Sequence, residues 1–181
     1  SSPLSRAQVI CLVRTTGKLH DVARKMHLEN EINWEKVVEL QGDLALPHLG
    51  LPDAQFSDLS MKVNLIIHNG AIVNSLLPYA ALRESNVLGT STILKLASLN
   101  RKKRVVFISS LSALHSSEYH QAITFSLPSS SKIVGPLGSG YGESKRASDC
   151  LVSSTHPFID VVIIRLGTVG FSSKTGAFNP K

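Results

Sequence analysis

The chain has 181 residues, of which 43% are hydrophobic and 18% are charged, and its formal net charge at pH 7 is +6. This composition excludes collagen, coiled-coil and disordered chains and suffices for one core of ordinary size, so we expect residues 1–181 to form a single domain or a piece of one. The basic residues are scattered, and their dense run Arg101–Arg104 lies between a predicted helix and a predicted strand, which favours a solvated turn over a nucleic-acid interface.

The predicted elements alternate between strands and helices along the chain. Short β-branched runs without polar alternation predict buried strands, and apolar residues three and four apart predict helices. This order predicts an α/β fold with a Rossmann-like, doubly wound parallel sheet. In chain order, the elements are a strand at Gln8–Val13, a helix at Lys18–Leu28, a short strand at Val37–Leu40, a helix around Asp58–Met61, a strand at Leu65–His68, a helix at Tyr79–Leu99, a strand at Val105–Ser109, a helix at Gly142–Ser153 and a strand at Val161–Arg165.

The sequence predicts neither a membrane span nor export. The longest apolar runs, Val63–Ile67 and Val161–Ile164, are far too short for a bilayer, and the first residues have no signal-peptide pattern. Cys11 and Cys150 have neither a CxxC pattern nor metal-ligand spacing. We interpret them as buried thiols in a reducing compartment, the cytoplasm.

Tyr141 and Lys145 form the strongest candidate for a catalytic pair. Because they lie four residues apart on a predicted helix, their side chains share one face. A nearby ammonium favours phenolate, so we expect a lowered pKa for Tyr141. Such a phenol can donate a proton to a carbonyl as hydride arrives, while the lysine holds the ribose hydroxyls of a cofactor. The spacing alone is common on ordinary helices, so the neighbouring segments must support this interpretation.

Two predicted strands end in residues that suit a ligand. Ser110 and Ser112 follow one strand at the carboxyl edge of the sheet, where open α/β sheets bind ligands, although hydroxyls there also cap turns. Asn69–Ala71 follow another strand and combine an amide with small residues that let a cofactor approach the main chain. Residues 116–139 lack periodicity and predict a long loop over this edge.

Asn86, Gly89 and Arg14 occupy positions that need an explanation. Asn86 and Gly89 are poor helix formers within a predicted helix, so we interpret Gly89 as a close packing contact and Asn86 as a hydrogen-bond partner of main chain near the active site. Arg14 follows the first strand, where the 2′-phosphate of NADPH would lie, although a surface arginine is equally compatible.

These segments, in this order, resemble the extended short-chain dehydrogenase/reductase superfamily. Within it they are similar to the thioester reductase domains that end nonribosomal peptide synthetases, polyketide-peptide hybrids, and aminoadipate and carboxylic acid reductases. The resemblance covers essentially the whole chain. It is carried by Cys11–Arg14, Gly42–Leu44, His68–Asn74, Pro78-Tyr79, Leu82-Arg83, Asn86–Thr90 and Gly138–Lys145.

The resemblance implies NADPH-dependent reduction of an acyl or peptidyl thioester to an aldehyde or an alcohol. The thioester would be carried on the phosphopantetheine arm of a carrier domain within a larger multidomain synthetase. Tyr141 would be the general acid, with Lys145 and Ser112 in the catalytic set. The implied cofactor-binding residues are Arg14 at the 2′-phosphate, Asp43 and Leu44 at the adenine, Asn69, Gly70 and Ala71 along the cofactor, Asn86 nearby, and Lys145 at the ribose.

Three departures from the family pattern affect these expectations. The Gly-rich phosphate loop would precede Ser1, so we expect a fragment, incomplete at both ends, that binds dinucleotides weakly or not at all by itself. Leu111 falls where the family has a hydroxyl of its catalytic triad, which leaves Ser112 or Ser110 to take over that role. Arg165–Gly167 reads Arg-Leu-Gly where the family has Arg-Pro-Gly, which leaves the shape of the substrate loop open.

Two other functions stay open at this point. Leu111 favours a redox-independent Dieckmann cyclase that releases a tetramic acid, with Asp149 as the base or an orienting partner. An ordinary helix ion pair of Asp149 with Lys145 or Arg146 is favoured over a catalytic role. The second alternative is a non-catalytic module of the same fold. The scattered His residues and the lack of a hydrolase elbow predict no metal site and no serine hydrolase.

Overall fold

The structure is a computed structural model that describes residues 7–114, 138–155, 158–173 and 176. The chain divides into two compact units, one of residues 1–43 and 168–181 and the other of residues 44–167. The predicted loop at residues 116–139 lies outside the described residues except for its last two positions.

The first unit (residues 1–43 and 168–181) contains a two-stranded parallel sheet. β1 (Val9–Val13) pairs with β2 (Val37–Gln41) along its whole length, and α1 (Lys18–Lys25) connects the two strands. α1 begins after Gly17, whose φ of 80° is one that glycine adopts without strain. This strand, helix and strand agree with the sequence prediction, with a helix that ends earlier than expected.

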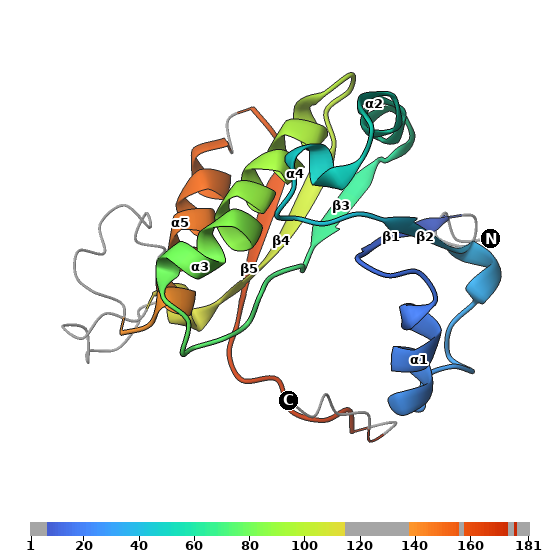
Figure 1. Cartoon of the computed structure of the whole chain (residues 1–181), viewed down its shortest axis with the longest axis horizontal. Helices are drawn as coiled ribbons and strands as arrows, with labels where there is room; N and C mark the ends of the chain where they lie inside the picture. Colours follow the sequence, from blue (N-terminus) through green and yellow to red (C-terminus); the bar gives the residue numbers. More distant parts are fainter. Residues whose placement is uncertain (1–6, 115–137, 156–157, 174–175, 177–181) are drawn as a thin grey trace. The chain divides into compact units, whose positions relative to one another are not determined.

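The second unit (residues 44–167) contains a three-stranded parallel sheet in the order β3-β4-β5. Helices connect its parallel strands, as the alternating pattern predicted. Figure 1 shows α3, α4 and α5 on one face of this sheet. The elements are α2 (Asp53–Lys62), β3 (Leu65–His68), α3 (Tyr79–Arg83), α4 (Gly89–Ser98), β4 (Arg104–Ser110), α5 (Gly140–Thr155) and β5 (Val161–Leu166).

The strands of the second unit are buried on one face only, so the prediction of fully buried strands was wrong. On β4, Val105, Phe107 and Ser109 are buried, while the residues between them are half-buried. The reason is that successive side chains of a strand point to opposite faces, and this unit's helices lie on one of them (Figure 1). The exposed apolar residues of β3 and β5 are Leu65, Ile67, Val162, Ile164 and Leu166.

A π-helical segment, Glu84–Leu88, interrupts the helix predicted at Tyr79–Leu99 and separates α3 from α4. Gly89 follows it and packs against Leu44, because a Cβ at Gly89 would lie 2.8 Å from the Leu44 carbonyl oxygen. This contact confirms the interpretation of Gly89 as a site of close packing. Single turns of π-helix occur frequently at functional sites, and this one contains Asn86.

The burial of Lys103 and of the two cysteines differs from the prediction. Lys103, within the basic run, is buried and donates hydrogen bonds from Nζ to the carbonyl oxygens of Leu99 and Arg101, each at 2.8 Å. It therefore satisfies main-chain groups at the end of α4 instead of facing solvent. Cys11 and Cys150 are free and half-buried rather than buried.

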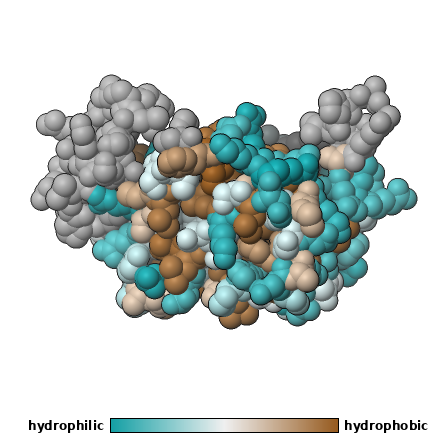
Figure 2. Space-filling view, turned by 90° about the horizontal axis from the view of Figure 1, so that it is seen from above, coloured by the Kyte–Doolittle hydropathy of each residue, from teal (hydrophilic) through white to brown (hydrophobic). Residues whose placement is uncertain are grey.

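On the face that Figure 2 shows, hydrophobic and hydrophilic residues are interspersed.

Candidate active site

The predicted pair Tyr141 and Lys145 lies in the first turns of α5, on the side that packs against the sheet. α5 starts at Gly140, where a Cβ would come within 2.5 Å of the Leu77 carbonyl oxygen and closer still to the Tyr79 nitrogen. Only glycine fits this approach without a shift of main chain. Gly140 therefore fixes the first turn of α5 against the start of α3, one residue before Tyr141.

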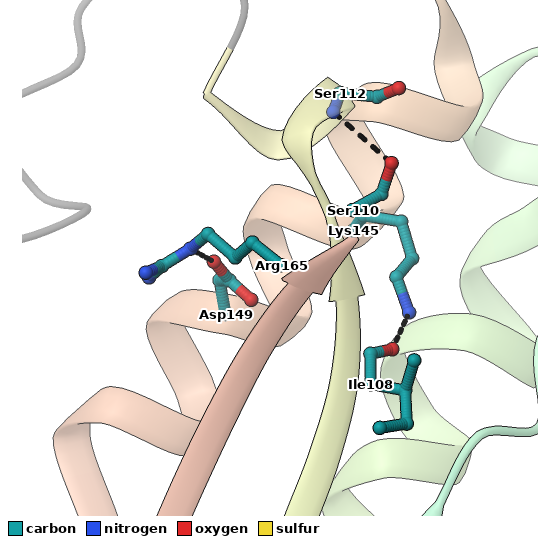
Figure 3. Close-up of polar contacts among 6 residues, drawn as sticks. All are labelled: Ile108, Ser110, Ser112, Lys145, Asp149 and Arg165. Carbon is teal, nitrogen blue, oxygen red and sulfur yellow. Dashed lines mark hydrogen bonds and ion pairs between the residues drawn. The ribbon is translucent and has the colours of Figure 1, made fainter. Parts of the chain in front are cut away.

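Lys145 is buried at the centre of this unit. Its Nζ donates a hydrogen bond to the Ile108 carbonyl oxygen at 2.8 Å (Figure 3) and lies 4.5 Å from the centre of the Phe107 ring. Burial lowers the pKa of Lys145 to about 8, and the Asp149 carboxylate opposes this shift. An ammonium with one bond to main chain keeps further N–H donors for a ligand.

Tyr141 is half-buried, and burial raises the pKa of its phenol above the ordinary value. The expectation of a lowered pKa was therefore wrong. The physical reason is that desolvation disfavours the phenolate more strongly than the hydrogen bond with Ser110 favours it. At neutral pH, Tyr141 is consequently a protonated phenol, the form that a general acid requires.

Ser110 is the residue that supplies a hydroxyl to Tyr141. The two side chains are hydrogen-bonded, and Ser110 Oγ also accepts the backbone N–H of Ser112 at 3.1 Å (Figure 3). This second bond caps the 3-10 turn Leu111–Ala113, so Ser112 supports Ser110 through its main chain. The site thus has a hydroxyl beside the phenol although Leu111 is aliphatic.

Asn86 clamps the chain that follows β3. Its Oδ1 accepts from the Ile72 nitrogen at 2.7 Å, and its Nδ2 donates to the Ile72 carbonyl oxygen at 3.0 Å and to Ser144 Oγ at 3.0 Å. The amide thus joins the π segment, the loop after β3 and α5. The interpretation that Asn86 bonds main chain is confirmed, and both of its N–H donors are used within the protein.

Asn69 and Gly70 are exposed and Ala71 is half-buried, directly after β3 at the carboxyl edge of the sheet. Leu44 lies beside Gly70, because a Cβ there would be 2.6 Å from Leu44 Cδ1. The structure thus brings together, within one unit, Leu44, the strand end at 69–71 and the helix that carries Tyr141 and Lys145.

Arg14 and Asp43 belong to the first unit, where they follow β1 and β2 at the carboxyl ends of paired strands. Arg14 is exposed, and its carbonyl oxygen accepts a hydrogen bond from Gln41 Nε2 at 3.4 Å. In the same unit, Glu39 accepts the backbone N–H groups of Gly17 and Leu19 at 2.5 and 3.2 Å and so satisfies the start of α1.

Sequence reasoning missed His68, the last residue of β3. His68 is buried, its Nε2 is 2.9 Å from Thr90 Oγ1, and its ring lies 5.5 Å from that of Phe107. Burial, with the Lys145 charge, lowers the pKa of His68 to about 4, so the imidazole is neutral. A histidine that ends a buried strand just before Asn-Gly was the available signal.

Asp149 is fully buried, and its Oδ2 accepts from Arg165 Nε at 2.6 Å (Figure 3). This ion pair joins Asp149 to β5, a partner that the sequence did not indicate. Among the described residues, no His, Cys, Asp or Glu group has the arrangement of a metal site. No helix in the described part of the chain is long and apolar enough to cross a membrane.

The family described as "Male sterility protein" (NAD_binding_4) matches residues 2–181 of the chain. The chain belongs to this family. Proteins that are similar to it include a linear gramicidin synthase of Brevibacillus parabrevis, 35% identical over 184 residues, and L-2-aminoadipate reductase of Schizosaccharomyces pombe, 34% identical over 192 residues. The alignments cover 96% and 97% of this chain but 4% and 14% of those proteins.

Solved structures agree with this assignment. The terminal R domain from the myxalamid PKS-NRPS biosynthetic pathway is 32% identical, with a TM-score of 0.81, over 97% of this chain and 46% of that one. UDP-glucuronic acid 4-epimerase from Bacillus cereus, solved in complex with NAD, shares the fold at 20% identity and a TM-score of 0.66, over 92% of this chain and 50% of that one. The Rossmann-like extended short-chain dehydrogenase/reductase fold and the resemblance to thioester reductase domains are thus confirmed.

Proposed function

We propose that this chain is part of an NADPH-dependent thioester reductase that releases an acyl or peptidyl group from a carrier domain as an aldehyde or an alcohol. The observation that carries the proposal is the grouping of Ser110, Tyr141 and Lys145 where β4 ends beside α5. The family and the relatives named above support the reaction class. In this proposal, residues 1–181 are one partial cofactor-binding domain of a larger multidomain synthetase in the cytoplasm.

The residues at the site fit a nicotinamide dinucleotide. Lys145 has N–H donors to spare for ribose hydroxyls, and the exposed main chain at Asn69 and Gly70 has no bulky side chain between it and a ligand. Lys145, Asn69, Gly70, Ala71 and Leu44 would hold the cofactor in the second unit. Asn86 would position the loop that follows them. In the first unit, Arg14 and Asp43 stay the candidate residues for the adenosine end, and Arg14 would select a 2′-phosphate. When bound, NADPH supplies a hydride.

The protein's own groups handle the oxygen of the thioester carbonyl. Tyr141, protonated because burial raises its pKa, donates its proton to that oxygen. The Ser110 hydroxyl hydrogen-bonds the same oxygen and steadies the charge that develops on it. The Lys145 ammonium stabilises the phenolate that Tyr141 leaves behind. The resulting thiohemiacetal breaks its C–S bond to give the aldehyde and the free phosphopantetheine thiol.

The Dieckmann cyclase alternative loses its support. It depended on Leu111 replacing a triad hydroxyl and on Asp149 as a base. Ser110 provides a hydroxyl beside Tyr141, and Asp149 is fully buried in an ion pair with Arg165. A carboxylate that is closed off from solvent and paired with a guanidinium is not placed to reach a substrate proton. A non-catalytic module would have no use for the buried Lys145 ammonium, whose desolvation is costly.

The experiment uses the intact protein with an acyl thioester loaded on its carrier domain. We expect loss of NADPH absorbance in proportion to the aldehyde or alcohol formed, and much slower loss with NADH. Release of a tetramic acid at the same rate without NADPH would overturn the proposal. Release without any cofactor oxidation, as a free acid, would overturn it as well.

A further inference from the structure

We propose that Asp149 and Arg165 are positioning residues that hold Lys145 in its catalytic place and charge state, an inference that rests on the reductase function proposed above. Neither residue belongs to the groups that would touch substrate or cofactor. The proposal depends on where the ion pair lies, on how deeply it is buried and on the balance of charge around Lys145.

The ion pair joins the helix that carries Lys145 to the last strand of the sheet. Asp149 is 0% exposed on α5, and its Oδ2 lies 2.6 Å from Nε of Arg165 on β5 (Figure 3). Arg165 is opposite Ser109 in the β4-β5 register, so it also stands beside the residue before Ser110. One contact therefore fixes α5 against the strand ends that form the site.

Lys145 lies one helical turn before Asp149, on the same face of α5. The carboxylate thus pairs with Arg165 and lies one helical turn from Lys145. The other titratable groups nearby are His68 of β3, across Phe107, and Tyr141, one turn earlier; both are uncharged at neutral pH. Asp149 is consequently the negative charge among these groups, and its loss would leave the buried Lys145 and the half-buried Arg165 without compensation.

The effect of Asp149 on the pKa of Lys145 agrees with this geometry. Burial lowers the pKa of Lys145 to about 8, and Asp149 opposes that fall. Asp149 Oδ1 is buried and has no hydrogen-bond partner among the described residues, so Arg165 does not use the whole carboxylate. Asp149 therefore acts on Lys145 by charge and not by a hydrogen bond: removing the carboxylate lowers the pKa of Lys145 further, and removing Arg165 takes away the other cation and raises that pKa.

The experiment compares Asp149→Asn and Arg165→Met in the intact protein, with Glu143→Gln as the matched control. Glu143 is an exposed acid on the same helix. The first readout is the pH dependence of NADPH oxidation and of NADPH binding. We expect the basic limb of Asp149→Asn to move about one unit to lower pH, that of Arg165→Met to move to higher pH, and that of the control to stay in place.

The second readout is the pH dependence of the unfolding free energy, which needs neither cofactor nor substrate. Because the folded pKa of Lys145 is below the unfolded value, stability rises with pH between them, and the start of this rise should shift in the same two directions. If the parent oxidises no NADPH but the two variants show these shifts in unfolding free energy, the reductase proposal is refuted and the ion-pair inference stands. Folded variants with the parent's profiles would overturn the inference, and Arg165→Met decides it alone if Asp149→Asn does not fold.

Discussion

At the residue scale, the hydroxyl beside Tyr141 is the point on which the proposed chemistry depends. Ser110→Ala removes a donor that the developing oxyanion would use, so we expect the rate of thioester reduction to fall by roughly 100- to 1000-fold. Ser112 supports Ser110 through its backbone N–H, so Ser112→Ala is the matched control and should keep most of the activity. Single-turnover rates compare the two variants, and a larger loss in Ser112→Ala would reverse the assignment.

The pH dependence of the reaction follows from two buried groups. The pKa of Lys145 is lowered to about 8 and that of Tyr141 is raised, so Lys145 is the first of the two to lose its proton as pH rises. We expect kcat/KM to fall above pH 8 because Lys145 becomes neutral while Tyr141 remains protonated. Lys145→Arg, whose cation does not titrate in this range, should remove that limb while lowering the maximum rate. An unchanged limb in this variant would assign the titration to another group.

His68 predicts how stability responds to acid. Its folded pKa of about 4 is below the ordinary value of 6.5, so the contribution of neutral His68 is complete above pH 6.5 and is lost as pH falls through 4. The difference corresponds to at most about 3 kcal/mol. His68→Gln, which can still hydrogen-bond Thr90, should flatten the dependence of the unfolding free energy on pH in urea titrations between pH 7 and pH 4. The same slope in parent and variant would show that other groups cause the acid sensitivity.

At the element scale, the start of α5 and the π segment fix the site. Gly140→Ala would press a methyl group against main chain of Leu77 and Tyr79, so we expect α5 to shift and the rate of reduction to fall more than the melting temperature alone would explain. Gly170→Ala is the control, because a Cβ there meets nothing within 4 Å. Equal rates for the two variants, measured in parallel with thermal unfolding, would contradict the role of Gly140.

Asn86 gives the second prediction at this scale. Asn86→Ala removes three hydrogen bonds and leaves polar groups of Ile72 without their partner, so we expect a loss of about 2–3 kcal/mol in the unfolding free energy. Because the clamp holds the loop after the proposed cofactor-binding residues, the KM for NADPH should also rise. Urea titration and initial-rate kinetics test this together. Asn86→Ala with the parent's stability would show that the clamp contributes little.

At the scale of the whole molecule, the sequence predicted much of the fold because local patterns determine it. β-branched runs mark β1, β3, β4 and β5, and the four-residue spacing placed Tyr141 and Lys145 on one face of α5. The one-sided burial of the sheet, the π segment and the burial of Lys103 depend on which elements pack together. Sequence spacing alone does not contain that information.

The sequence left the serine hydroxyl of the site open between Ser110 and Ser112 for a similar reason. Ser110 and Ser112 stand at the point where β4 passes into a 3-10 turn, and the direction of a side chain there follows from backbone angles that the sequence pattern does not give. The pKa of Tyr141 likewise depends on burial, which raises it more than the hydrogen bond with Ser110 lowers it.

The most direct test of the reductase is the mass of the product formed from NADPH that carries deuterium at the transferable position. With the intact protein and a carrier-bound acyl thioester, we predict an aldehyde with one deuterium on the former carbonyl carbon, or an alcohol with two. Tyr141→Phe should lower the rate of this transfer without changing the product mass. A product that contains no deuterium would contradict the account, because the thioester would then have been released without reduction.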